Sequence, residues 1–284
     1  MRTRPFKQVD VFTATPYRGN PLAVVLDAEG LDDTAMQRFA QWTNLSETTF
    51  VLPPIEAAAD YRVRIFTPGG ELPFAGHPTL GSCHAWLEAG GQPRTAGRVV
   101  QQCAKGLVDI RRGEGGALAF AAPALTRSNP SPSALAQIAA ALGLKPAQVL
   151  AAQVLDNGPV WFGLLLDSAQ SVLGLNPDHA QLKALGWKAG VANVGVAAAE
   201  AGAPQVVVRA FASPMGVNED PVTGSFNASL AQWLMAEGLA PERYLASQGE
   251  RLGRAGRVQV ERDAQGQVWV GGESVTCVDG SVRL

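Results

Sequence analysis

The chain contains an internal repeat, and this feature most restricts its fold, because a duplicated sequence predicts two halves of similar structure. Arg-Ile-Phe at residues 64–66 recurs as Arg-Ala-Phe at 209–211, an offset of 145, and both copies are followed shortly by proline and glycine. His-Pro-Thr-Leu-Gly-Ser at 77–82 then corresponds to Asp-Pro-Val-Thr-Gly-Ser at 220–225, an offset of 143. The alternative is chance, since proline near a helix start and glycine after a helix end are common. Matches on a strand and on a helix, in the same order, favour a duplication.

The composition is that of a folded protein with roughly two domains of about 150 residues. The 284 residues are 46% hydrophobic and 17% charged, so the apolar surface is ample and intrinsic disorder is excluded. The net charge of −2 argues against a nucleic-acid partner, which requires a basic surface. Strand-like segments outnumber helical ones without regular alternation, and this predicts an α+β fold rather than a doubly wound one.

Few residues are available for metal or disulfide chemistry. The three cysteines, Cys83, Cys103 and Cys277, are odd in number and lack CxxC spacing, and the three histidines form no metal-binding motif. The sequence therefore predicts no disulfide framework, no metal ion and no cofactor. It contains no run of about 18 uncharged apolar residues and no apolar signal-peptide core. We expect a soluble, cytoplasmic protein without a membrane partner.

Hydrophobic periodicity and turn residues predict the order of the elements. Asp32 or Asp33 is expected to cap a helix that carries Met36, Phe39 and Ala40 on one face. A stretch rich in proline, serine and asparagine at 123–133 predicts a crossover between the two halves. Further helices are predicted at 133–142, 146–150 and 225–238. Strands are predicted around 9–11, 22–26, 48–52, 61–65, 98–103, 107–111, 118–120, 160–166 and 205–211, and in the tail from 257 onward.

The two repeated turns predict helix starts that could bind an anion. Asp220 is a suitable N-cap with Pro221 as the first helical residue, and His77 holds the matching place before Pro78. The first amides of a helix have no intrahelical partner and attract carboxylates. If the halves pack about a pseudo-twofold axis, His77 and Asp220 lie on opposite walls of one cleft. Taken singly, each residue has a simpler interpretation, as a structural histidine and an ordinary cap.

Several motifs together resemble the phenazine-biosynthesis PhzF-like family. They are Asn-Leu-Ser-Glu-Thr-Thr-Phe at 44–50, Ala-Gly-His-Pro-Thr-Leu-Gly at 75–81 and Glu-Asp-Pro-Val-Thr-Gly-Ser at 219–225, with further similar segments at 9–12, 19–24 and 248–254. One departure is Phe226, where a smaller residue would be more usual. The resemblance implies the diaminopimelate epimerase-like fold: two similar halves, each a curved, barrel-like β-sheet around a central helix.

The same resemblance implies where the halves begin and end. The N-terminal half is expected to comprise residues 1–122 and a returning C-terminal strand at about 272–284, and the C-terminal half residues 123–271. The central helices would be 78–89 and 221–237, with the active site between the halves. A homodimer, common in the family, is a further expectation.

By the resemblance, Glu47 is the catalytic acid and base. Its neighbours are partly apolar, so we expect a raised pKa, although the local sequence alone favours a capping or solvent-exposed glutamate. His77 would orient or relay the proton or bind a polar group of the substrate, and Asp220 would hold an amino or hydroxyl group. Helix amides would bind a carboxylate. The expected substrate contacts are Asn20, Ser46, Gly76, Pro78, Thr79, Thr223, Gly224 and Ser225, with Gly19 as a further neighbour.

The implied reaction is a cofactor-free isomerisation by proton transfer on a small carboxylate-bearing molecule. The family's namesake acts on trans-2,3-dihydro-3-hydroxyanthranilate, and this substrate is not assigned to the chain. Epimerases of the fold typically use two opposed cysteines, but neither repeated turn contains one and Cys83 lies several residues into the first helix. A racemase or epimerase is therefore less favoured. The other alternative is a carboxylate-binding protein without turnover.

Overall fold

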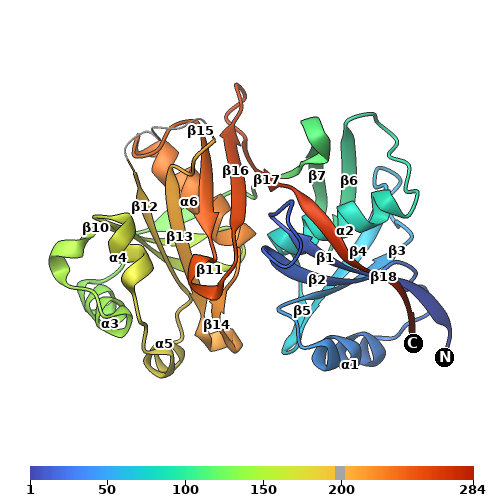
Figure 1. Ribbon diagram of the computed structural model, residues 1–284, viewed down its shortest axis with the longest axis horizontal. Helices are drawn as coiled ribbons and strands as arrows, with labels where there is room; N and C mark the ends of the chain where they lie inside the picture. The colour runs from blue at the N-terminus through green and yellow to red at the C-terminus, as the bar shows by residue number, and fades with distance from the viewer. Residues whose placement is uncertain (196–201) are drawn as a thin grey trace. The chain divides into compact units, whose positions relative to one another are not determined.

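The computed structural model describes residues 1–195 and 202–284, and its contacts divide the chain into two units (Figure 1). The first unit consists of Met1–Ala121 together with Gly271–Leu284, and the second of Ala122–Val270. The domain boundaries expected from the sequence lie one residue away from these limits.

The first unit is a curved, mixed sheet with one helix packed on its concave side and one outside. β1 pairs antiparallel with β18 and β2, β2 pairs parallel with β3, and β3 pairs antiparallel with β4. β4 then pairs parallel with β6, which continues antiparallel through β7 to β8, while the short β5 folds back on β4. The strands are β1 (Thr3–Val11), β2 (Asn20–Val25), β3 (Thr48–Leu52), β4 (Tyr61–Thr67), β5 (Gly70–Leu72), β6 (Arg98–Cys103), β7 (Gly106–Arg112), β8 (Leu118–Ala121) and β18 (Ser274–Arg283), and the helices are α1 (Asp33–Thr43) and α2 (Gly76–Glu88).

Helix α2 is the core of the first unit. It packs against β1, β2, β3, β6, β8 and β18, so strands surround it. Gly81 permits the close approach, because a Cβ at this position would lie 2.6 Å from the side chain of Leu22 and 2.8 Å from that of Val11. Helix α1 covers the other side of β3 and β4, and its N-cap is Asp32, whose carboxylate accepts the Ala35 amide at 2.7 Å, as predicted.

The second unit repeats this order of pairing. β9, β10 and β11 pair antiparallel, β11 pairs parallel with β12, and β12 pairs antiparallel with β13. β13 pairs with the short β14, then parallel with β15, which continues antiparallel to β16. The strands are β9 (Thr126–Ser128), β10 (Val149–Asp156), β11 (Val160–Leu166), β12 (Ala189–Val194), β13 (Val206–Ala212), β14 (Val217–Asp220), β15 (Arg243–Gln248) and β16 (Gly256–Arg262), with β17 (Val268–Gly272) at the boundary, and the helices are α3 (Pro132–Leu142), α4 (Ala169–Gly174), α5 (His179–Leu185) and α6 (Gly224–Ala236).

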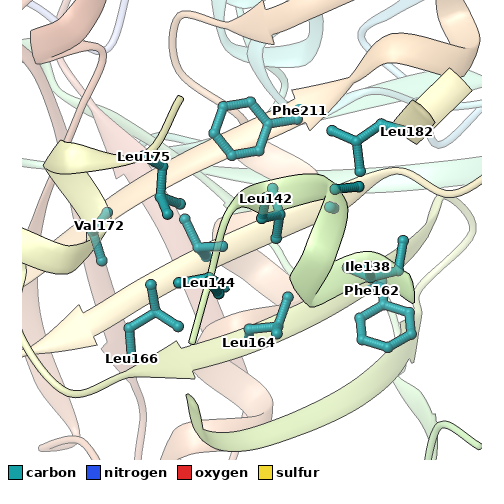
Figure 2. Close-up of a cluster of buried hydrophobic side chains, with 13 residues drawn as sticks. Ile138, Leu142, Leu144, Phe162, Leu164, Leu166, Val172, Leu175, Leu182 and Phe211 are labelled. Atoms are coloured by element: carbon teal, nitrogen blue, oxygen red, sulfur yellow. The ribbon is translucent and has the colours of Figure 1, made fainter. Parts of the chain in front are cut away.

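A cluster of buried hydrophobic side chains in the second unit packs three helices against the sheet (Figure 2). Leu142 from α3, Val172 from α4 and Leu182 from α5 meet Phe162 of β11 and Phe211 of β13, and all are buried. The short helices α4 and α5 are absent from the sequence prediction. Residues 146–150, predicted as helix, form one 3-10 turn, Pro146–Gln148, followed by the start of β10.

A repeated arginine–glutamate pair supports the duplication. Arg64 donates two hydrogen bonds to Glu71, and Arg209 donates two to Glu219. Each guanidinium also lies 5.0 Å from the ring of the phenylalanine two residues later on its strand. The repeated Arg-x-Phe sequence therefore makes the same contacts in both units.

The second central helix begins three residues later than the family resemblance implies and one residue before the start predicted from the local sequence pattern. Asp220 is the last residue of β14, and α6 starts at Gly224 with Thr223 as its N-cap. The prediction that Asp220 caps the helix, with Pro221 as the first helical residue, is therefore wrong. The Asp220 carboxylate instead accepts a hydrogen bond from Thr223 Oγ1 at 2.6 Å, so it closes the turn before the helix.

The pairing of His77 with Asp220 across the repeat is also wrong. Both central helices have 13 residues and begin with glycine, so His77, the second residue of α2, corresponds to Ser225 of α6. The sequence match shifted the register because it aligned two prolines with different places in the structure. Pro78 lies in the first turn of α2, whereas Pro221 precedes α6.

Candidate active site

Glu47 and His77 come together in the first unit. Glu47 lies in the connector before β3, and His77 in the first turn of α2, which packs against β3. Glu47 Oε2 is 3.6 Å from His77 Nε2, and the two side chains are 16% and 4% exposed. This distance is too long for a hydrogen bond between the two side chains. It is short enough that a single polar group of a ligand could contact both of them.

The environment of His77 favours the neutral imidazole. Burial lowers its pKa to about 3, against the opposing effect of a hydrogen bond with the Pro21 backbone. On the side away from Glu47, Nδ1 lies 3.3 Å from Nδ2 of Asn20, which is fully buried. Asn20 and Pro21 are the first two residues of β2, so the start of this strand fixes the orientation of the His77 ring. A neutral imidazole can both donate and accept a proton.

Polar side chains in the core hold α2 beneath His77. Thr79 donates from Oγ1 to the Ala75 carbonyl at 2.9 Å and accepts from Nε2 of Gln101 at 2.9 Å. The side-chain oxygen of Gln101, Oε1, accepts a hydrogen bond from the Tyr61 hydroxyl at 2.8 Å. Thr79 is fully buried, so its hydroxyl supports the helix, and this use differs from the substrate contact expected for it.

In the second unit, the predicted residues Asp220, Thr223, Gly224 and Ser225 gather at the start of α6. The backbone amides of Gly224 and Ser225 belong to the first turn of α6. Amides in the first turn of a helix have no hydrogen-bond acceptor within the helix. Ser225 Oγ accepts the indole N–H of Trp161 at 3.1 Å. Because an indole nitrogen can only donate, the Ser225 hydroxyl keeps its own proton for another acceptor.

Two residues outside the predicted set therefore hold Ser225. Trp161, at the start of β11, binds its hydroxyl, and Asn157, in the turn before β11, donates from Nδ2 to its carbonyl at 3.1 Å. Both are buried. Neither belongs to a motif, and they lie more than sixty positions away along the chain, so only the tertiary fold identifies them.

The predicted residues thus form two groups, one within each unit. Asn20, Ser46, Glu47, Gly76, His77 and Pro78 lie around the start of α2, and Asp220, Thr223, Gly224 and Ser225 around the start of α6. Cys83 belongs to neither group: it is fully buried on α2, and burial raises its thiol pKa to about 12. A protonated, buried thiol is a poor base.

Residues 1–195 and 202–284 offer no clustered ligands for a metal ion. They contain no group of three or more His, Cys, Asp or Glu side chains suited to that role. Among the helices that these residues form, none is both long enough and apolar enough to cross a membrane.

The chain is similar to known proteins over its whole length. The family model for phenazine biosynthesis-like proteins matches residues 9–280. Antisense-enhancing sequence 1 of Schizosaccharomyces pombe is 37% identical, with 99% of each chain covered. The trans-2,3-dihydro-3-hydroxyanthranilate isomerase of Pseudomonas aeruginosa is 32% identical, covering 97% of this chain and 98% of the relative. Other relatives of similar coverage are also isomerases.

Solved structures confirm the predicted α+β, epimerase-like fold. A PhzF-family protein of Enterococcus faecalis is 26% identical, with a TM-score of 0.80 and full coverage of both chains. A Bacillus anthracis member of that family has a TM-score of 0.86 at 24% identity, again with full coverage. A hydroxyproline epimerase of Agrobacterium vitis, 14% identical, shares the fold with a TM-score of 0.61, covering 99% of this chain and 92% of its own. The chain therefore belongs to the phenazine biosynthesis-like family and is an isomerase.

Proposed function

We propose that the chain is a cofactor-independent isomerase that moves a proton on a small carboxylate-bearing metabolite, with Glu47 as the acid and base. The observation that carries the proposal is the contact between Glu47, a partly buried carboxylate, and the neutral, buried imidazole of His77. Carboxylates positioned in this way act as general bases and, once protonated, as general acids.

In the proposed reaction, Glu47 takes a proton from a carbon next to a conjugated system. The electron pair of the broken C–H bond moves into that system, and Glu47 returns the proton to a different carbon. His77 stays neutral at physiological pH, so it can donate to, or accept from, a polar group of the substrate or of Glu47 without adding charge. The Asn20 and Pro21 contacts keep the ring in this orientation.

The start of α6 supplies groups suited to a substrate carboxylate. The first-turn amides carry positive partial charge, and the Ser225 hydroxyl has its proton available, because Trp161 occupies its oxygen. We propose that Ser225 and the Gly224 amide bind the carboxylate and that Asp220 binds an amino or hydroxyl group of the same substrate. The Asp220→Asn variant should then raise KM for substrates that carry such a group.

Solvent exchange tests the proposal directly. The protein is incubated in D2O with trans-2,3-dihydro-3-hydroxyanthranilate, the compound in the name of several relatives, and with a panel of other small carboxylates. We expect a mass gain of one deuterium in a substrate with the wild type. Loss of the acid and base in Glu47→Gln should slow it by about 10²–10⁴-fold, with circular dichroism unchanged. Glu29→Gln, which makes the same charge change at an exposed position, is the control.

The outcomes separate the alternatives. Exchange that persists in Glu47→Gln would remove Glu47 from the mechanism. Binding of a carboxylate, measured as a thermal shift, without any mass gain in any compound would favour a carboxylate-binding protein without turnover.

A further inference from the structure

We propose that Gln248 is a positioning residue that fixes the turn before α6 and directs the hydroxyl proton of Thr223 onto the Asp220 carboxylate. The proposal rests on the proposed function, in which Asp220 binds the substrate. Gln248 is the last residue of β15, and its side chain is 1% exposed.

The side-chain amide of Gln248 is fully used by residues of this turn and the helix that follows. Its Oε1 accepts the backbone N–H of Thr223 at 3.0 Å and Nδ2 of Asn227 at 2.9 Å. Its Nε2 donates to Thr223 Oγ1 at 2.9 Å and to the Asp220 carbonyl at 3.1 Å. Two acceptor bonds and two donor bonds are the full capacity of an amide side chain, so no part of it remains for a substrate.

The polarity of Gln248 decides the direction of the next hydrogen bond. An amide NH2 can only donate, so Thr223 Oγ1 accepts from it and must use its single proton elsewhere. That proton points to Asp220 Oδ2, 2.6 Å away. The order is therefore Gln248 to Thr223 to Asp220, and it ends in a charge-assisted bond to the carboxylate.

The backbone around Gln248 is shaped to the same turn. Gly249 has a φ of +93°, and a Cβ there would lie 2.6 Å from the Pro221 carbonyl oxygen. A Cβ at Gly256, the residue paired with Gln248 on β16, would lie 2.4 Å from the Val222 side chain. The hairpin formed by β15 and β16 thus packs directly on residues 221 and 222, which join Asp220 to Thr223.

Charged side chains also lie on the elements packed against this turn. Arg209 and Glu219, on β13 and β14, bind each other. Arg254 packs with its stem against Gly249 on the hairpin connection. Gln248 itself is neutral, so it holds the turn without adding a charge beside Asp220.

The test measures the titration of the Asp220 carboxyl by ¹³C NMR in the full-length protein, with its signal assigned by its loss in Asp220→Asn. Gln248→Glu keeps the shape and the two acceptor bonds but removes both donor bonds and adds negative charge. We expect the titration midpoint of the Asp220 carboxyl to rise by one pH unit or more, a tenfold change. We also expect kcat/KM to fall about tenfold for the substrate that incorporates deuterium. Gln259→Glu, on the exposed face of β16, should change neither.

Two more variants keep the proposal testable if Gln248→Glu does not fold. Thr223→Val removes the hydroxyl, and Gln248→Met removes the amide without adding charge; both should raise the midpoint. The shift caused by Gln248→Met should be smaller in the Thr223→Val background, because both changes act on one chain of hydrogen bonds. An unchanged Asp220 midpoint in the folded Gln248 variants overturns the proposal.

Failure of the proposed function gives a different pattern. If Glu47→Gln retains exchange while Gln248→Glu still moves the Asp220 titration, the mechanism is wrong and the positioning role stands. If Glu47→Gln abolishes exchange and the Gln248 variants leave the Asp220 titration midpoint unchanged, only the positioning role fails.

Discussion

Arg209 binds Glu219 through two hydrogen bonds of 2.9 and 2.7 Å, and these two side chains are only 5% and 9% exposed. The Arg209 guanidinium also donates to the carbonyls of Val172 and Leu175 at the end of α4. The corresponding pair in the first unit, Arg64 and Glu71, has similar geometry but is 22% and 35% exposed. The duplication thus provides two equivalent ion pairs that differ in burial and in their further partners, since Arg64 also donates to the Asp33 carboxylate at 2.6 Å.

We predict that neutralising the buried pair costs far more stability than neutralising the exposed one. Glu219→Gln leaves a buried guanidinium without its counter-charge, so it should lower the free energy of unfolding by about 3–5 kcal/mol. Glu71→Gln should cost about 0–1 kcal/mol, because water screens the exposed pair and Asp33 still binds Arg64. Urea denaturation followed by tryptophan fluorescence measures both variants. Equal losses would contradict the assignment of the difference to burial.

The low pKa of His77 predicts a pH dependence of stability. Burial lowers this pKa from its ordinary value of 6.5, which we expect for the unfolded chain, to about 3 in the folded protein. Between these two values the unfolded state therefore binds more protons. Stability from this residue is complete above about pH 6.5 and falls as the pH is lowered toward 3, by about 1.4 kcal/mol per pH unit.

The His77→Gln variant isolates this effect from other titrating groups, including His84, whose pKa is also lowered by burial. Between pH 7 and pH 5 the wild type should lose about 2 kcal/mol more of its unfolding free energy than the variant. Parallel curves for the two proteins would show that His77 is protonated in the folded state at pH 5.

Local sequence signals predicted most of the strands, and tertiary contacts explain what they missed. The predicted segments 48–52 and 160–166 agree with β3 and β11, because their period and flanking turn residues are local. The local pattern places the start of α6 at 225, within one residue of Gly224. The alternative start at Pro221 is wrong because Asp220 and Pro221 have the chemistry of a helix start, but the Asp220 carboxylate accepts a hydrogen bond from Thr223. Gln248 stands out in the sequence only as part of a motif, since its four bonds reach residues 21 to 28 positions away.

The candidate site could be predicted only in part for the same reason. Glu47 is one carboxylate among many, and its local sequence favours a capping or exposed glutamate. The family resemblance, not the spacing, selected it. The contact with His77, thirty positions away, arises only when α2 packs on β3.

Cys83 should be dispensable for catalysis. Burial raises its pKa to about 12, so almost no thiolate exists at neutral pH. Cys83→Ala should keep deuterium incorporation within about threefold of the wild type, since the substituted group takes no part in proton transfer. In native protein a thiol reagent should modify the partly exposed Cys277 and spare Cys83, and labelling should disappear in Cys277→Ala. Loss of exchange in a folded Cys83→Ala protein would instead support a cysteine mechanism.

The unusual Phe226 is explained by a glycine on the strand that it faces. Phe226 is fully buried on α6 and its ring lies 5.4 Å from that of Trp161. A Cβ at Gly190 of β12 would lie 2.2 Å from two atoms of the Phe226 ring. The large side chain therefore fits because the strand has no side chain at this point, and the two positions form a complementary pair.

This complementarity predicts a rescue. Gly190→Ala should lower the free energy of unfolding by about 1–3 kcal/mol through overpacking, whereas Gly280→Ala, on β18 with no atom within 4 Å of the new Cβ, should change it little. Phe226→Leu alone should lose stability through a cavity. The double variant Gly190→Ala/Phe226→Leu should be more stable than the sum of the single losses predicts, because the smaller ring-free side chain leaves room for the methyl group. Strictly additive losses in thermal or urea unfolding would mean that Gly190 and Phe226 do not share this space.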